Sequence, residues 1–162
     1  MAELTNLETK LGEVIGLAMA AQAATERVEK LTTDAKLRKQ LKTMRQEAAK
    51  AEKDGTAVAA SFNGKKSKIL GEARTVKTKG ATMMKTYLER DSDELDGCEF
   101  LTMAEAGEVG HWGVLQELNK QARHPGVRDL VKVQLPIQRR HLKDVLASSL
   151  QLAAKEDANA TA

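Results

Sequence analysis

Apolar residues recur every three or four positions through the first sixty residues, and this spacing restricts the fold more than any other feature. In the first stretch they are Leu4, Leu7, Leu11, Val14, Ala18, Ala21, Thr25 and Val28. In the second they are Leu37, Leu41, Met44, Ala48, Ala51, Gly55, Val58 and Phe62. Residues spaced in this way lie along one face of a helix, so each stretch predicts a long amphipathic helix.

The boundaries of further helices follow from turn residues. Asp34 is expected to cap the second helix after a short break, which makes the first two helices antiparallel neighbours. Asn63-Gly64 is expected to end that helix. The remaining segments are a helix over 68–90, an acidic loop over 91–97, a helix over 99–122, a turn at His124-Pro125-Gly126 and a helix over 127–154, kinked at Pro136.

The expected fold is an all-α antiparallel four-helix bundle, with two helical hairpins joined by a long crossover that contains an extra helix. One domain over 1–154 and a frayed tail over 155–162 fit the length of 162 residues. Cys98 is the one cysteine and no membrane-spanning stretch is found, which favours a cytoplasmic protein. No Ser/His/Asp or Cys/His set indicates an enzyme.

A few polar residues fall on the apolar faces of the last two helices. At 100° per residue, Glu108 lies near the centre of its face, with His111 one turn on and Glu105 at the edge. Gln138 is central on the next helix and His141 lies beside it. Folding the two helices about Pro125 is expected to bring Glu108 level with His141, and His111 level with Gln138.

Two interpretations of this cluster are possible. It is either a hydrogen-bonded polar layer that fixes the register of the helices, or a metal site built from inward-facing carboxylates and imidazoles. Two imidazoles and a carboxylate suit iron, manganese or zinc, so the candidate cofactors are Fe, Mn and Zn. The candidate ligands are Glu108, His111, His141, Gln138, Glu105 and Glu47.

In its order of helices and in these motifs the chain resembles the ferritin-like superfamily, most nearly the bacterial stress-inducible ferritin-like proteins. The resemblance covers nearly the whole chain. It rests on the Gly64-Lys65-Lys66 turn, the crossover helix, Glu105-x-x-Glu108 before Trp112-Gly113, and Leu135-x-x-Gln138-x-x-His141. It implies a ferritin-like bundle with metal ligands in its core and a role in stress.

The superfamily pattern is Glu on the first helix, Glu-x-x-His on the second, Glu on the third and Glu-x-x-His on the fourth. This chain departs from it in three places, with Ala18 for the first glutamate, Lys50 for the second helix's histidine and Gln138 for the last glutamate. The remaining carboxylates are fewer than a dinuclear iron centre needs, so a mononuclear site is expected if metal binds.

Two other functions stay open. A structural or interaction bundle would keep the polar layer without metal. DNA binding is the third, through a basic stretch over 64–85 that includes Lys65, Lys66, Lys68, Arg74, Lys77 and Lys79. A homodimer is expected, because two-fold symmetry is the commonest among oligomers.

Overall fold

Five helices and no strands make up the part of the chain that the structure, a computed structural model, describes, residues 3–161. The helices are α1 (Asn6–Leu31), α2 (Ala35–Ala59), α3 (Lys66–Tyr87), α4 (Glu94–Ala122) and α5 (Pro125–Ala153). The prediction of an all-α helical bundle is confirmed. Among the described helices, none is both long and apolar enough to cross a membrane.

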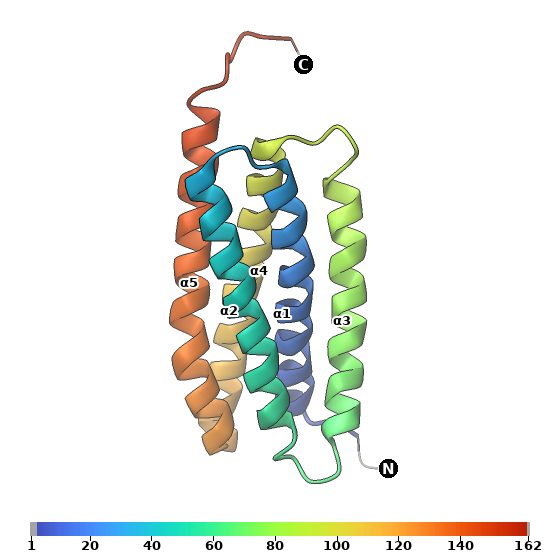
Figure 1. Cartoon of the computed structure of the whole chain (residues 1–162). Coiled ribbons are helices and arrows are strands. Elements are labelled where there is room, and N and C mark those ends of the chain that lie inside the picture. Colours follow the sequence, from blue (N-terminus) through green and yellow to red (C-terminus); the bar gives the residue numbers. More distant parts are fainter. Residues whose placement is uncertain (1–2, 162) are drawn as a thin grey trace.

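The helices run alongside one another over the length of the molecule (Figure 1). α1 and α2 form one antiparallel hairpin, and α4 and α5 form the other. Between the hairpins, α3 carries the chain from one end of the bundle to the other along the outside of α1. Two glycines permit this packing, because a Cβ at Gly12 or Gly16 would lie within 2.6 Å of a carbonyl oxygen of α3.

Local capping explains where helices begin. The Asp34 side chain accepts from the backbone N–H of Leu37, as predicted. α4 begins five residues earlier than the predicted residue 99, because Asp93 and Asp96 form a reciprocal capping box. Acidic side chains also stabilise the positive N-terminal end of a helix, so most of the predicted acidic loop is helical.

The end of α2 also differs from the prediction. α2 ends at Ala59, before Asn63-Gly64, since Ser61 and Phe62 turn back onto the last carbonyls of the helix. Gly64 then takes the left-handed φ of 71° that favours glycine. α5 continues as one helix through Pro136, whose ring removes a single backbone donor.

The core consists of two apolar clusters, one toward each end of the bundle. One contains Leu11, Trp112 and Leu135, and the other contains Leu41, Leu101 and Val145. Along α4 and α5 the two clusters are separated by a short polar stretch, and this interruption positions the candidate site.

Candidate functional site

A layer of polar side chains divides the two apolar clusters at mid-bundle. On α4, Glu105 and Glu108 fall between Leu101 and Trp112. On α5, Gln138 and His141 fall between Leu135 and Val145, and on α2 the layer is completed by Glu47. The side chains of α4 and α5 in this layer are all buried, with Glu105 only 1% and Glu108 only 3% exposed. The sequence therefore identified the level of the bundle at which polar residues gather.

His141 is the centre of the layer. Its Nε2 lies 2.5 Å from Oε2 of Glu47, and its Nδ1 lies 3.5 Å from Oε2 of Glu105. Burial alone would lower the pKa of His141, but the two carboxylates outweigh burial and the pKa is raised above its ordinary value. The imidazole therefore bridges a carboxylate of α2 and a carboxylate of α4.

Glu47 is held in place from α5. Arg140 donates to its Oε1 over 2.5 Å, while His141 faces its Oε2. Burial alone would raise the pKa of Glu47, but Arg140 and His141 outweigh burial and lower it. Glu47 thus contacts one guanidinium group and one imidazole, both from α5.

Glu108 has no cationic partner. Gln138 donates its amide N–H to Oε2 of Glu108. Burial and the nearby charge of Glu105 raise the pKa of Glu108 well above its ordinary value, and the hydrogen bond from Gln138 offsets only part of this effect. A proton or a nearby cation would therefore stabilise this carboxyl group inside the bundle.

Glu105 has a buried oxygen without a hydrogen bond. Its Oε2 receives no hydrogen bond, because the 3.5 Å separation from His141 Nδ1 is too long for one. Buried carboxylate oxygens are normally satisfied, and an exception calls for an explanation. The gap between this oxygen and His141 is the least satisfied part of the layer.

The expected pairing of these residues was wrong. Glu108 bonds Gln138, and His141 contacts Glu47 and Glu105. His111 lies outside the layer, with its side chain 42% exposed and its Nδ1 3.1 Å from Oε2 of Glu13. His111 lies on the side of α4 that packs against α1, so its imidazole faces α1.

Two positions where the chain departs from the ferritin-like pattern lie at the layer or beside it. Ala18 is buried on α1 and supplies no polar atom. Lys50 is exposed and pairs with Asp54 over 2.5 Å, so its ammonium does not enter the layer.

The cation that neutralises Glu47 is Arg140, which sequence reasoning missed. It follows Gln138 by two residues and precedes His141, and only the packing of α2 on α5 reveals its role.

Within residues 3–161, no group of three or more His, Cys, Asp or Glu side chains is arranged so as to hold a metal ion. In the layer itself, Glu47 and Glu105 contact opposite nitrogens of one imidazole. Glu108 turns toward Gln138 instead of toward that imidazole. Convergence of Glu105, Glu108 and His141 on one ion therefore requires a carboxylate to rotate.

The basic stretch lies on α3 and in the turn before it. Lys65 is engaged by Oε2 of Glu8 at 2.8 Å and by the carbonyl of Glu3 at 3.2 Å. The exposed members are Lys66, Arg74, Lys77, Lys79 and Lys85. They stand on a helix that covers α1, with partly buried Glu72 among them.

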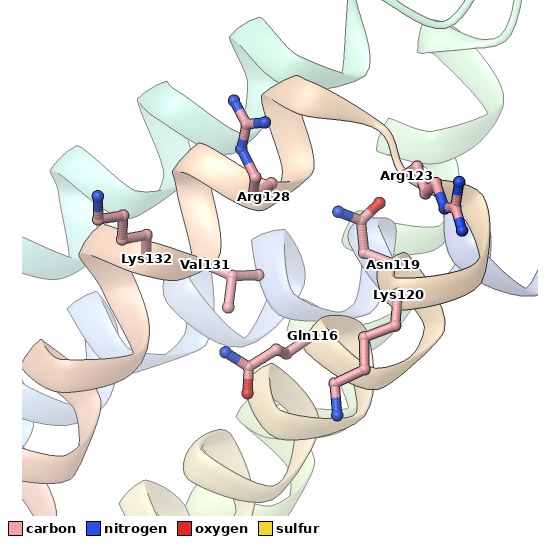
Figure 2. Close-up of a pocket in the computed structure, with 7 residues that line it drawn as sticks. All are labelled: Gln116, Asn119, Lys120, Arg123, Arg128, Val131 and Lys132. Atoms are coloured by element: carbon pink, nitrogen blue, oxygen red, sulfur yellow. The ribbon is translucent and has the colours of Figure 1, made fainter.

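A second basic surface lies where α4 meets α5. A hollow of about 600 Å³ there is lined by Lys120, Arg123, Arg128 and Lys132 around buried Val131. Figure 2 shows Arg128 and Lys132 extending from α5 on one side and Lys120 from α4 on the other. Arg128 pairs with Asp129 and Lys120 with Glu117. The charges do not converge on one point, so the hollow is not a built anion site.

The mid-bundle layer is therefore the best-defined candidate site. It unites Glu47, Glu105, Glu108, Gln138 and His141 from three helices, and it excludes His111. Comparison of this chain with models of known protein families, with curated proteins and with solved structures found no match.

Proposed function

We propose that this protein is a ferritin-like, stress-associated bundle that binds one divalent transition-metal ion between α4 and α5. The order of its helices supports the ferritin-like assignment, because two antiparallel hairpins are joined by a crossover along the bundle. The ligands would be Glu105, Glu108 and His141, with Gln138 as a weaker oxygen donor. The ion would be Fe(II), Mn(II) or Zn(II), which accept this mixture of imidazole and carboxylate.

One observation carries the proposal: the gap between His141 Nδ1 and the oxygen of Glu105 that receives no hydrogen bond. The two atoms are 3.5 Å apart. Two ligands of one tetrahedral metal, each about 2.1 Å from it, are separated by about 3.4 Å. The observed separation is thus too long for a good hydrogen bond and close to that of two ligands of one ion.

The surroundings of His141 fit the same assignment. A metal-binding histidine commonly donates its other ring N–H to a carboxylate, which fixes the tautomer and the ring. Here Nε2 faces Glu47, and Arg140 holds Glu47 in turn. Glu47 would therefore orient the ligand without binding the ion, and Nδ1 would remain for coordination.

Charge favours a single ion. Glu105 and Glu108 are both buried carboxylates, and His141 supplies the one imidazole of the layer, between Glu105 and Glu47. Arg140 already neutralises Glu47. A divalent ion would supply the positive charge that Glu108 lacks. Where bound, it would provide a Lewis-acidic centre, redox-active in the case of iron or manganese.

A second function is favoured by specific contacts. Gln138 and Arg140 satisfy Glu108 and Glu47 without any ion. In that alternative the layer fixes the register of the helices in a non-catalytic structural or interaction bundle, and Glu108 carries a proton. Both alternatives use the same residues, so they must be separated by a measurement of bound metal.

The test is elemental analysis of protein loaded anaerobically with Fe(II), Mn(II) or Zn(II) and then desalted. The variants are His141→Asn and, as a matched control, His111→Asn, which alters an imidazole of the same bundle outside the layer. We expect about one ion per chain in the unmodified protein and in His111→Asn, and none in His141→Asn. An absence of retained metal, or equal retention by both variants, would overturn the proposal in favour of the structural alternative.

A further inference from the structure

The outward side of α4 is an exposed helix face without charge along its middle. The exposed residues between Glu99 and Glu117 are Met103, Ala106, Gly107, Gly110, Val114 and Gln116. Met103 is 39% and Val114 is 47% exposed. The solvent side of a bundle helix is normally charged or polar, so an uncharged face of about five turns is unusual for a helix that contacts only water.

The glycines of this face are not explained by packing within the chain. Glycine inside a helix is destabilising relative to alanine. A Cβ at Gly12 or Gly55 of other helices would meet a neighbouring helix within 2.7 Å, so glycine there permits close packing. A Cβ at Gly107, Gly110 or Gly113 would meet no atom of the described residues within 4 Å. A second molecule that packs closely on α4 would account for glycine at these positions.

The two ends of the face carry opposite charge. Glu99 is exposed at the N-terminal end and forms no ion pair within residues 3–161. Lys120 is exposed at the other end, on the rim of the hollow of about 600 Å³ that Arg128 and Lys132 also line (Figure 2). Glu99 and Lys120 are about 32 Å apart along α4, at 1.5 Å per residue. They therefore cannot meet within one chain.

This arrangement is complementary to itself when the helix is reversed. Glu99 and Lys120 are equally distant from one point on α4, beside Gly110, and so are Ala106 and Gly113. A two-fold axis at that point places α4 of a second copy antiparallel to the first. Glu99 of each copy then lies opposite Lys120 of the other, and the small residues meet at the centre. Two-fold interfaces between identical chains have this reciprocal pairing.

We propose that the outward face of α4 is the surface on which two copies of this chain form an antiparallel two-fold dimer. The small residues let the two helices approach, and Met103 and Val114 supply apolar contact. The two pairs of Glu99 with Lys120 fix the direction of pairing, because a parallel arrangement would place like charges opposite each other at both ends. The polar layer uses the inward side of α4, so the dimer does not depend on the proposed metal site.

The first measurement is the mass in solution by sedimentation equilibrium, from about 1 µM to about 1 mM protein, where weak complexes dissociate. We expect a reversible change from monomer to dimer across this range. Association should weaken at high salt, because the charged pairs lie at the exposed ends of the face. A monomer at every concentration would overturn the inference.

Gly110→Gln tests the location. Two glutamine side chains at the closest approach of the helices should raise the dissociation constant at least about tenfold. Gly71→Gln is the matched control on α3, where a Cβ comes no nearer than 3.8 Å to a described neighbour. It should dimerise as the unmodified protein does, and circular dichroism verifies that both variants are folded. Unchanged dimerisation of Gly110→Gln would overturn the assignment of this face.

Glu99→Lys and Lys120→Glu test the direction of pairing. Either change alone places like charges opposite each other at both ends of the interface, so each dissociation constant should rise at least about tenfold. An equimolar mixture of the two variants restores both pairs of opposite charge in a heterodimer. Its dissociation constant should return to within about threefold of the unmodified value.

Glu26→Lys is the control for charge. It makes the same change as Glu99→Lys at an exposed site of α1 and also removes an ion pair, with Lys30. It should dimerise as the unmodified protein does. Failure of the mixture to restore association, or equal weakening by Glu26→Lys, would overturn the antiparallel pairing of α4.

Discussion

The contact of α1 with the crossover helix α3 gives a prediction whose magnitude follows from two distances. The perturbation is Gly16→Ala. A Cβ at position 16 would lie 2.4 Å from the carbonyl oxygen of Ala73 and 2.7 Å from Cβ of Val76. Both atoms belong to a helix, so relief requires α3 to move away from α1 by nearly 1 Å.

Two opposing effects determine the net change in the free energy of unfolding. Overpacking of a tight core contact costs about 1–3 kcal/mol, and contact with a backbone atom places the cost near the upper end. Replacement of glycine by alanine inside a helix returns about 1 kcal/mol. We therefore expect Gly16→Ala to lower the free energy of unfolding by about 2 kcal/mol.

The assay is urea denaturation followed by circular dichroism. With a slope of about 2 kcal/mol per molar, the midpoint should fall by about 1 M. Gly113→Ala makes the same chemical change where a Cβ meets no atom within 4 Å, and it should raise the stability by about 0.5–1 kcal/mol. If both variants shift in the same direction by similar amounts, the close packing of α3 on α1 is refuted as the cause.

Three further predictions concern buried titratable groups in the metal-free protein. Because the pKa of Glu108 is raised in the folded state, the free energy of unfolding should fall as pH rises above about 4.3. Glu108→Gln should reduce this decline, measured as the difference between the urea midpoints at pH 5 and pH 8. The raised pKa of His141 adds stability that is fully present below its pKa in the unfolded state and is lost as pH rises through its pKa in the folded state. His141→Ala leaves Glu47 and Glu105 without this partner, so it should lower the free energy of unfolding by about 3–5 kcal/mol at pH 6, measured by the same assay. Burial and, to a lesser extent, Glu94 raise the pKa of Cys98 to about 11, so a thiol reagent at pH 8 should label native protein far more slowly than unfolded protein, and equal rates would contradict its burial.

Periodicity predicted the helices well because the three-and-four spacing depends only on local geometry. Asp34 is an instance, since a cap needs only its own first turn. The start of α4 was misplaced because negative charge was read as a loop signal. At Asp93 and Asp96 the same charge stabilises a helix N-terminus.

The candidate site was predicted in part. Residues at the centre of a helical face, such as Glu108 and Gln138, point into the core whatever the neighbours are, so their burial could be foreseen. Residues at the flank face whichever helix packs there. His111 therefore meets Glu13, and Arg140 meets Glu47, and neither contact can be read from one helix alone.

The uneven attachment of α3 has a consequence for motion. Its buried residues, Ile69 and Ala73, belong to its first half, where the glycines of α1 admit it. Beyond Ala73, no residue of α3 is buried. Local openings have low free energy where few apolar contacts are lost, so amide protons over 77–87 should exchange with solvent sooner than those near Ile69. Gly80 and Met83 of this looser half line a cavity of about 190 Å³ beside Glu105 and Glu108, so opening of α3 would widen that cavity without unfolding the bundle.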